Sequence, residues 1–147
     1  INSLAPHGPL PMATVRPPRD AETDPRVKAV FDDIRKTRGT DFINNFWRYL
    51  AFDPGLLEQV WTDVRDVMAK DSALDGKTKE MIYIAVSIAN SCDYCIHSHT
   101  ASARARGMTS AEYADLLRVV STAARTNHLV NGMKVPVDPE FDADPAT

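Results

Sequence analysis

The chain has 147 residues, of which 44% are hydrophobic and 25% are charged, and its formal net charge is -3. This length predicts one domain with its own core, and the composition is that of a globular protein. The acidic balance argues against a nucleic-acid partner, and the lack of an apolar run of about 18 residues argues against a membrane span. Without a secretory signal, a cytoplasmic location is expected.

The two ends of the chain differ from its middle. Residues 1–22 are rich in proline and lack periodicity, which predicts an extended or disordered arm. Because the chain starts at Ile1 and Met12 offers a natural start, residues 1–11 are interpreted as a non-native extension. Residues 23–135 are predicted to form one helical domain, and residues 136–147 an acidic tail.

Helix signals recur through that domain. Aspartate caps, Asp-Pro steps and glycine stops predict helices at about 24–38, 42–51, 53–69, 76–90, 92–106 and 109–131. The run MIYIAVSIA makes the fourth helix apolar nearly all round, so it is expected at the centre of the core. No segment alternates as a strand does. The predicted class is all-α, a compact bundle of about six helices.

Aromatic residues are concentrated near the second and third helices. We interpret them as core or subunit-interface residues, and the surplus of apolar positions favours oligomerisation. They are Phe42, Phe46, Trp47, Phe52 and Trp61.

The two cysteines, Cys92 and Cys95, open the fifth predicted helix. On a helix, Cys95 and His99 lie at about 300° and about 340° from Cys92, on one face, whereas His97 lies at about 140°. Thiols in the first turn of a helix meet free N–H groups and the positive end of the dipole, which favours the thiolate. A thiolate that attacks a peroxide becomes a sulfenic acid, and a second cysteine converts that acid to a disulfide.

Two other interpretations of the cysteine pair are open, a structural zinc site and a pair of inert thiols. A structural zinc site needs four ligands, and Cys92, Cys95 and His99 supply three. Two inert buried thiols are also compatible with the spacing. Glu80, twelve residues before Cys92, is either a solvated charge near a helix start or an inward proton acceptor close to the cysteines.

The spacing Glu80-x11-Cys92-x2-Cys95-x3-His99 resembles the signature of the alkylhydroperoxidase D-like family, in the carboxymuconolactone decarboxylase superfamily. The run over residues 90–101 and the ending Arg104-x-x-Gly107-Met108-Thr109 are also close to that pattern. The resemblance is strongest over residues 70–125.

This resemblance implies an alkylhydroperoxidase D-like fold, with Cys95 as the peroxidatic cysteine and Cys92 as the resolving one. It implies that Glu80 and His99 form a proton relay. It also implies a homo-oligomer, often a trimer or hexamer. No cofactor and no metal are expected. One departure is Tyr94, which stands where the best-known peroxidases of the family carry a histidine, so the relay is expected to be simpler.

The leading hypothesis is therefore an enzyme, a thiol-dependent peroxidase. It would reduce hydrogen peroxide or organic hydroperoxides and be recycled by an external dithiol such as a lipoyl or thioredoxin-like protein. The alternative is a disulfide oxidoreductase or redox sensor without efficient peroxide turnover. A metal-binding non-enzyme is a further alternative, and a decarboxylase a distant one.

Overall fold

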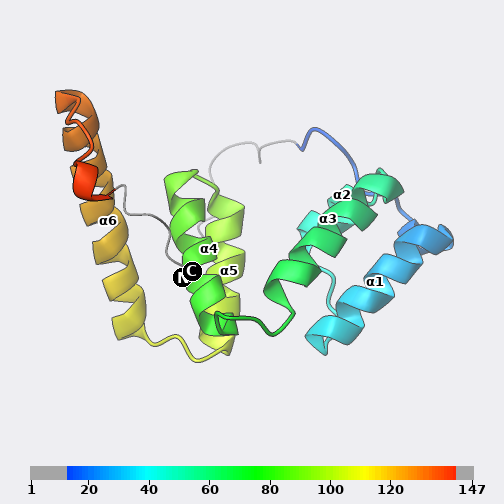
Figure 1. The fold of residues 1–147 in the computed structure, drawn as a ribbon. Helices are drawn as coiled ribbons and strands as arrows, with labels where there is room; N and C mark the ends of the chain where they lie inside the picture. Colours follow the sequence, from blue (N-terminus) through cyan, green and yellow to red (C-terminus); the bar gives the residue numbers. More distant parts are fainter. Residues whose placement is uncertain (1–12, 142–147) are drawn as a thin grey trace, which may run out of the picture. The chain divides into compact units, whose positions relative to one another are not determined.

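The computed structural model describes residues 13–141 and is all-α over that range, as predicted (Figure 1). The predictions for residues 1–11 and for the end of the acidic tail fall outside these residues. Six α-helices and two short 3-10 helices follow one another: η1 (Ala21–Thr23), α1 (Pro25–Arg38), α2 (Asn45–Leu50), α3 (Pro54–Met68), α4 (Gly76–Ala89), α5 (Asp93–Ala105), α6 (Ser110–Met133) and η2 (Pro139–Phe141). Across the described residues, no helix has the length and apolarity to cross a membrane.

Helices α1, α3, α4 and α6 begin at the capping residues that the sequence predicted. The side chains of Asp24, Asp53 and Asp75 accept hydrogen bonds from the backbone N–H groups of Arg26, Leu56 and Thr78. At the start of α6, Thr109 and Glu112 form a complete capping box. These bonds satisfy N–H groups that have no partner inside the helix.

Some boundaries differ from the predicted ones. The second helix is shorter than 42–51, because it begins only after Asn44, which is extended. The last helix continues past residue 131 to Met133, where Lys134 turns into the left-handed region with φ 53°. The arm predicted over 1–22 includes the start of the short helix η1.

The buried side chains form two separate clusters, in two compact units that divide between Lys70 and Asp71. The sequence predicted one domain over 23–135. In the first unit, α1 and α3 lie side by side (Figure 1), and Trp47 and Trp61 meet edge to face at 5.3 Å. The prediction of an aromatic core holds for these two residues, whereas Phe42, Phe46 and Phe52 are exposed.

The second unit is built on the pair α4 and α5, with the first half of α6 packed against α4 (Figure 1). Its core consists of Ile84, Ala103, Met108 and Leu116. The expectation that α4 lies at the centre of the core holds for one face only, because Ile82 and Val86 are 47% and 53% exposed. Only one face of α4 is covered, and that face carries Glu80.

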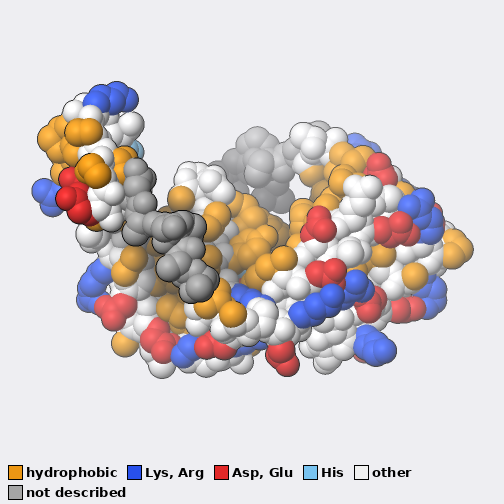
Figure 2. All heavy atoms as spheres, in the orientation of Figure 1, with side chains coloured by type: hydrophobic (Ala, Val, Ile, Leu, Met, Phe, Trp, Pro, Cys, Tyr) orange, Lys and Arg blue, Asp and Glu red, His pale blue; other side chains and the backbone are white. Residues whose placement is uncertain are grey.

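The second half of α6 is covered by no other described residue. Every residue over 121–133 is exposed, although Val130 and Met133 are apolar. Figure 2 shows hydrophobic side chains gathered toward this end of the helix, at the upper left. A helix that is apolar in part and uncovered commonly marks an interaction surface.

Candidate active site

Cys92 and Cys95 form a disulfide where the chain passes from α4 into α5. Cys92 is the residue that caps α5, and the backbone N–H of Cys95 donates a hydrogen bond to Cys92 Sγ over 3.3 Å. Both side chains are half-buried. A thiol that approaches from solvent therefore has access to the disulfide, and a helix N-terminus favours negative charge on the sulfur that leaves.

The connection that presents this disulfide is very short. Only Asn90, Ser91 and Cys92 separate the last residue of α4, Ala89, from the first residue of α5, Asp93. Ser91 has φ 56°, in the left-handed region that non-glycine residues rarely adopt. The Cys92 N–H donates to the Ser87 carbonyl over 2.9 Å, which ties the capping residue to the last turn of α4.

Glu80 of α4 contacts His99 of α5. Glu80 Oε2 lies 2.6 Å from His99 Nδ1, and the Glu80 side chain is only 7% exposed. Burial of a carboxylate is costly unless it is hydrogen-bonded or paired, and His99 supplies that partner. Glu80 thus faces inward and is not a solvated charge, and its role as a proton acceptor for the cysteines stays a prediction. The contact occupies Nδ1 and leaves Nε2 of His99 for proton exchange.

Two further side chains contact this pair, and neither was predicted. The Tyr83 ring stacks on the His99 ring, with centroids 3.6 Å apart and planes 20° from parallel. The Arg106 Nε lies 3.9 Å from Glu80 Oε1. Tyr83 is three residues after Glu80, a spacing that places both on one helix face, so its position was readable from the sequence. Arg106 gives no such signal.

The other residues of the motif face outward. His97 is exposed, as its place on the helix predicted. Tyr94 is 44% exposed on the first turn of α5. Within residues 13–141, no three His, Cys, Asp or Glu side chains gather as a metal site would require.

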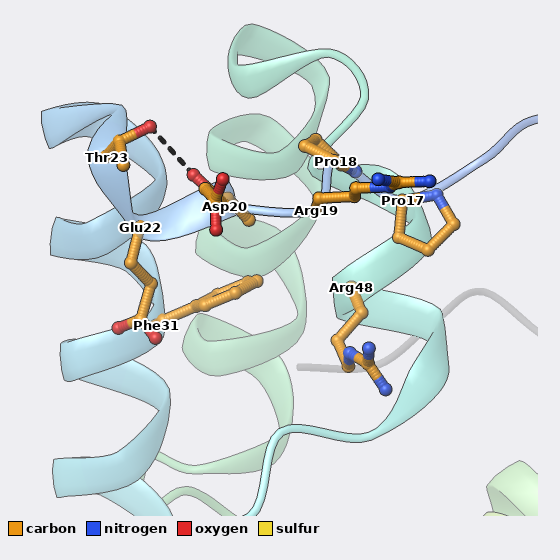
Figure 3. A pocket seen from close by; sticks show the side chains of 9 residues that line it. Pro17, Pro18, Arg19, Asp20, Glu22, Thr23, Phe31 and Arg48 are labelled. Atoms are coloured by element: carbon orange, nitrogen blue, oxygen red, sulfur yellow. Dashed lines mark hydrogen bonds between the residues drawn. The ribbon is translucent and has the colours of Figure 1, made fainter.

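A separate hollow of about 470 Å³ lies in the first unit, between the segment before α1 and helices α1 and α2 (Figure 3). Acidic and basic side chains are mixed around it, and Thr23 Oγ1 donates to the Asp20 carbonyl over 2.7 Å. None of the predicted site residues lines it. Its lining consists of Pro17, Pro18, Arg19, Asp20, Ala21, Glu22, Thr23, Phe31 and Arg48.

The comparison with known families agrees with this geometry. Residues 55–138, more than half of the chain, match the carboxymuconolactone decarboxylase family. The chain belongs to this family. Within it, the chain is 60% identical to an alkylhydroperoxidase AhpD core from Rhodospirillum rubrum whose crystal structure is known. The match covers 90% of this chain and 99% of that one, with a TM-score of 0.87.

A second protein that is similar to this chain is a more distant relative. It is the uncharacterized protein 4 in the cox locus of Paracoccus denitrificans, which is 29% identical over 65 residues. That match covers 44% of this chain and 59% of the relative, so the chain spans less than two thirds of its length. The predicted alkylhydroperoxidase D-like fold is confirmed by the R. rubrum structure. The roles assigned to Cys95, Cys92, His99 and Glu80 stay predictions.

Proposed function

We propose that this protein is a thiol-dependent peroxidase that reduces hydrogen peroxide or organic hydroperoxides. The observation that carries the proposal is the Cys92–Cys95 disulfide at the start of α5, on the same helix as a histidine held by a buried glutamate. The likeness to an alkylhydroperoxidase AhpD core supports it. A disulfide is also the product that such a reaction leaves behind.

The oxidative half of the cycle uses both cysteines. The Cys95 thiolate attacks the peroxide O–O bond, forms a sulfenic acid and releases an alkoxide, which takes a proton to become an alcohol, or water from hydrogen peroxide. The Cys92 thiol then attacks the Cys95 sulfur, and water leaves as the disulfide forms. His99 follows Cys95 by one helical turn, so it is placed to accept the thiol proton, and Glu80 stabilises the resulting imidazolium.

The reductive half needs an external dithiol, such as a lipoyl or thioredoxin-like protein. Its thiolate attacks one sulfur of the disulfide, and the other sulfur leaves as a thiolate. The Cys95 N–H that donates to Cys92 Sγ favours Cys92 as the leaving group. The mixed disulfide then forms on Cys95, and the second thiol of the reductant releases it. A reducing compartment such as the cytoplasm suits this cycle.

Replacement of Cys95 tests the proposal directly. Cys95→Ser is expected to abolish peroxide consumption in the presence of dithiothreitol, whereas Ser102→Ala on the same helix should leave it unchanged. A Cys95→Ser protein that consumes peroxide at the wild-type rate would refute the assignment. Titration of free thiols before and after peroxide should show the loss of two thiols per chain, restored by the dithiol.

A disulfide oxidoreductase or redox sensor is the second candidate, and Tyr94 favours it. A phenol does not exchange protons near neutral pH, so peroxide oxidation without a histidine at this position would be slow. Stopped-flow oxidation of the reduced protein separates the two functions. Slow oxidation by peroxide together with rapid exchange with thiols supports the second candidate. Metal analysis of freshly purified protein tests the metal-binding alternative, and the family match keeps a decarboxylase as a further one.

We also propose that the chain forms a homo-oligomer, a trimer or hexamer, through α6. Val119, Val130 and Met133 lie on one stripe of this helix and are 68%, 51% and 67% exposed. Burial of such a stripe against a second copy would remove apolar surface from water.

A further inference from the structure

Arg106 reaches the buried carboxylate from the far end of α5. It is the residue that caps the C-terminus of α5, and its Nε lies 3.9 Å from Glu80 Oε1. The other carboxylate oxygen, Oε2, is occupied by His99. The Glu80 side chain is 7% exposed, whereas that of Arg106 is 45% exposed. Arg106 therefore brings a positive charge from the surface to one side of Glu80, opposite an oxygen that His99 does not use.

The guanidinium reaches this place because position 76 has no side chain. A Cβ at Gly76 would lie 1.9 Å from Arg106 Nη1 and 2.8 Å from Cζ. Gly76 is the first residue of α4, one turn before Glu80. Any other residue there would push the Arg106 side chain away. Because the obstructed atoms are the end of a flexible side chain, the helix itself would tolerate the change.

The turn after α5 fixes where Arg106 leaves the backbone. Gly107 has φ 92°, its N–H donates to the Arg104 carbonyl, and the Met108 N–H donates to the Ala103 carbonyl. This is a Schellman motif, and its apolar contact is present because Met108 and Ala103 both belong to the core. The position of Arg106 is thus set by buried residues.

Without Glu80, the position of the Arg106 guanidinium at the start of α4 would be electrostatically unfavourable. A cation beside the N-terminus of α4 opposes the helix dipole. Glu80 supplies the attraction that offsets it. Glu112 of α6 does not, because it pairs with Lys77 over 2.8 Å. Among the described residues, His99 and Arg106 each bring a nitrogen within 4 Å of a Glu80 oxygen, and the Tyr83 ring stacks on His99.

We propose that Arg106 is a positioning residue for the proposed thiol chemistry, and that Gly76 is the residue that admits its guanidinium. Arg106 approaches Oε1 of Glu80 while His99 Nδ1 contacts Oε2, so its positive charge tempers the attraction of the carboxylate for a protonated His99. The inference rests on the proposed function for its chemical meaning. The charge coupling itself is measurable in the disulfide form, without any turnover.

The experiment follows the His99 ring by NMR as a function of pH, in protein with the disulfide formed, so that no cysteine titrates. The His99→Gln spectrum assigns the signal among the four histidines. Removal of a positive charge makes protonation of the imidazole easier. Arg106→Ala is therefore expected to raise the pH midpoint of the His99 signal by roughly half a pH unit. Arg106→Lys should restore most of the wild-type midpoint.

Gly76→Ala supplies the second arm. It should raise the midpoint as Arg106→Ala does, because it displaces the same guanidinium, and the double variant should be no further shifted than either single one. Arg104→Ala is the matched control. The Arg104 guanidinium lies over the Tyr113 ring, 5.7 Å from its centroid, and its loss should leave the midpoint unchanged.

The outcomes separate this inference from the proposed function. A midpoint that is the same in wild type and Arg106→Ala overturns the inference, and so does a Gly76→Ala shift that persists in full when Arg106 is already absent. Peroxide consumption is measured separately. An inactive wild type with the expected NMR shifts would refute the peroxidase and keep the Arg106 coupling. An active wild type without the NMR shifts would support the peroxidase and overturn the Arg106 coupling.

Discussion

Glu80 Oε2 lies 2.6 Å from His99 Nδ1, and this contact joins α4 to α5 one helical turn after Cys95. It fixes one ring nitrogen of His99 and leaves the other for proton transfer. The contact also gives a partner to an acidic residue on the buried face of α4, which carries Ile84 and Ser87 as well. The chemistry proposed for Cys95 therefore depends on a carboxylate that comes from the neighbouring helix.

Glu80→Gln tests that dependence. Glutamine keeps the size of the side chain and a hydrogen-bonding group, but it removes the negative charge that stabilises the imidazolium. Peroxide consumption with dithiothreitol is expected to fall by roughly a hundredfold, the lower range for loss of a general acid–base contribution. Glu112→Gln, on α6, is the control and should retain the wild-type rate. An undiminished rate in Glu80→Gln would exclude Glu80 from the relay.

Tyr83 is expected to act through its ring and not through its hydroxyl. The stack on His99 restricts rotation of the imidazole, and such aromatic contacts are worth about 1 kcal/mol. Tyr83→Leu should lower the peroxide rate by roughly fivefold, whereas Tyr83→Phe should keep it. If both variants lose the same activity, the hydroxyl matters and the stacking argument is wrong.

The sequence predicted best those parts of the fold, such as helix starts, that depend on hydrogen bonds between residues close in the chain. The caps at Asp24, Asp53 and Asp75 act within one helical turn, so the helix starts could be placed closely. The covering of α4 depends instead on which helices pack against it. Ile82 and Val86 fit a buried helix by pattern alone, yet they are exposed. Periodicity reports apolar character and does not report which partner covers it.

The candidate site shows the same contrast between features set within one helix and contacts between helices. The cysteine pair and His99 share one helix, so their spacing was enough to group them. Glu80 came from the resemblance, because spacing alone did not decide whether it faces inward. Arg106 was missed, since its contact with Glu80 needs the turn at Gly107 and the missing side chain at Gly76. These are contacts between elements, which no single-helix pattern contains.

The mixed disulfide formed during reduction is predicted to lie on Cys95. The Cys95 N–H that donates to Cys92 Sγ stabilises Cys92 as the leaving thiolate. Brief treatment of the oxidised protein with a limiting monothiol, followed by acid quenching, should therefore place most of the adduct on Cys95. Peptide mapping by mass spectrometry measures the ratio. An adduct found mainly on Cys92 would reverse the proposed order of reduction.

Assembly through α6 predicts a clear effect of charge on its apolar stripe. Thr126 lies on the same stripe, and its hydroxyl bonds to the Thr122 and Ala123 carbonyls, so that its polar group is already satisfied. Val130→Glu would bury a charge in the interface and should yield monomers in light scattering. His128→Glu lies on the opposite side of the helix and should leave the assembly intact. A wild-type protein that is monomeric at high concentration would contradict the proposal.

Asp33 is expected to make the stability of the first unit depend on pH. The Trp61 Nε1–H donates to Asp33 Oδ2 over 2.7 Å, and Arg65 Nη1 lies 3.0 Å from the same oxygen. The Trp61 hydrogen bond first, and Arg65 second, hold the pKa of Asp33 below its ordinary value of 3.8. The unfolded chain thus takes up the proton more readily than the native one. The stabilisation is present above the ordinary pKa and is lost as the pH falls through the lower native value.

Asp33→Asn keeps an oxygen for Trp61 and removes the charge. At pH 7 it should lower the free energy of unfolding by about 1 kcal/mol, a modest figure because the site is partly open to solvent. The difference should be smaller at pH 3 than at pH 7, because the stabilisation from the wild-type carboxylate begins to fall once the pH is below the ordinary pKa of 3.8. Both tryptophans lie in the first unit, so urea unfolding followed by tryptophan fluorescence reports on it. Asp63→Asn, at an exposed position of α3, is the control. A loss that is equal at both pH values would mean that the charge of Asp33 contributes nothing.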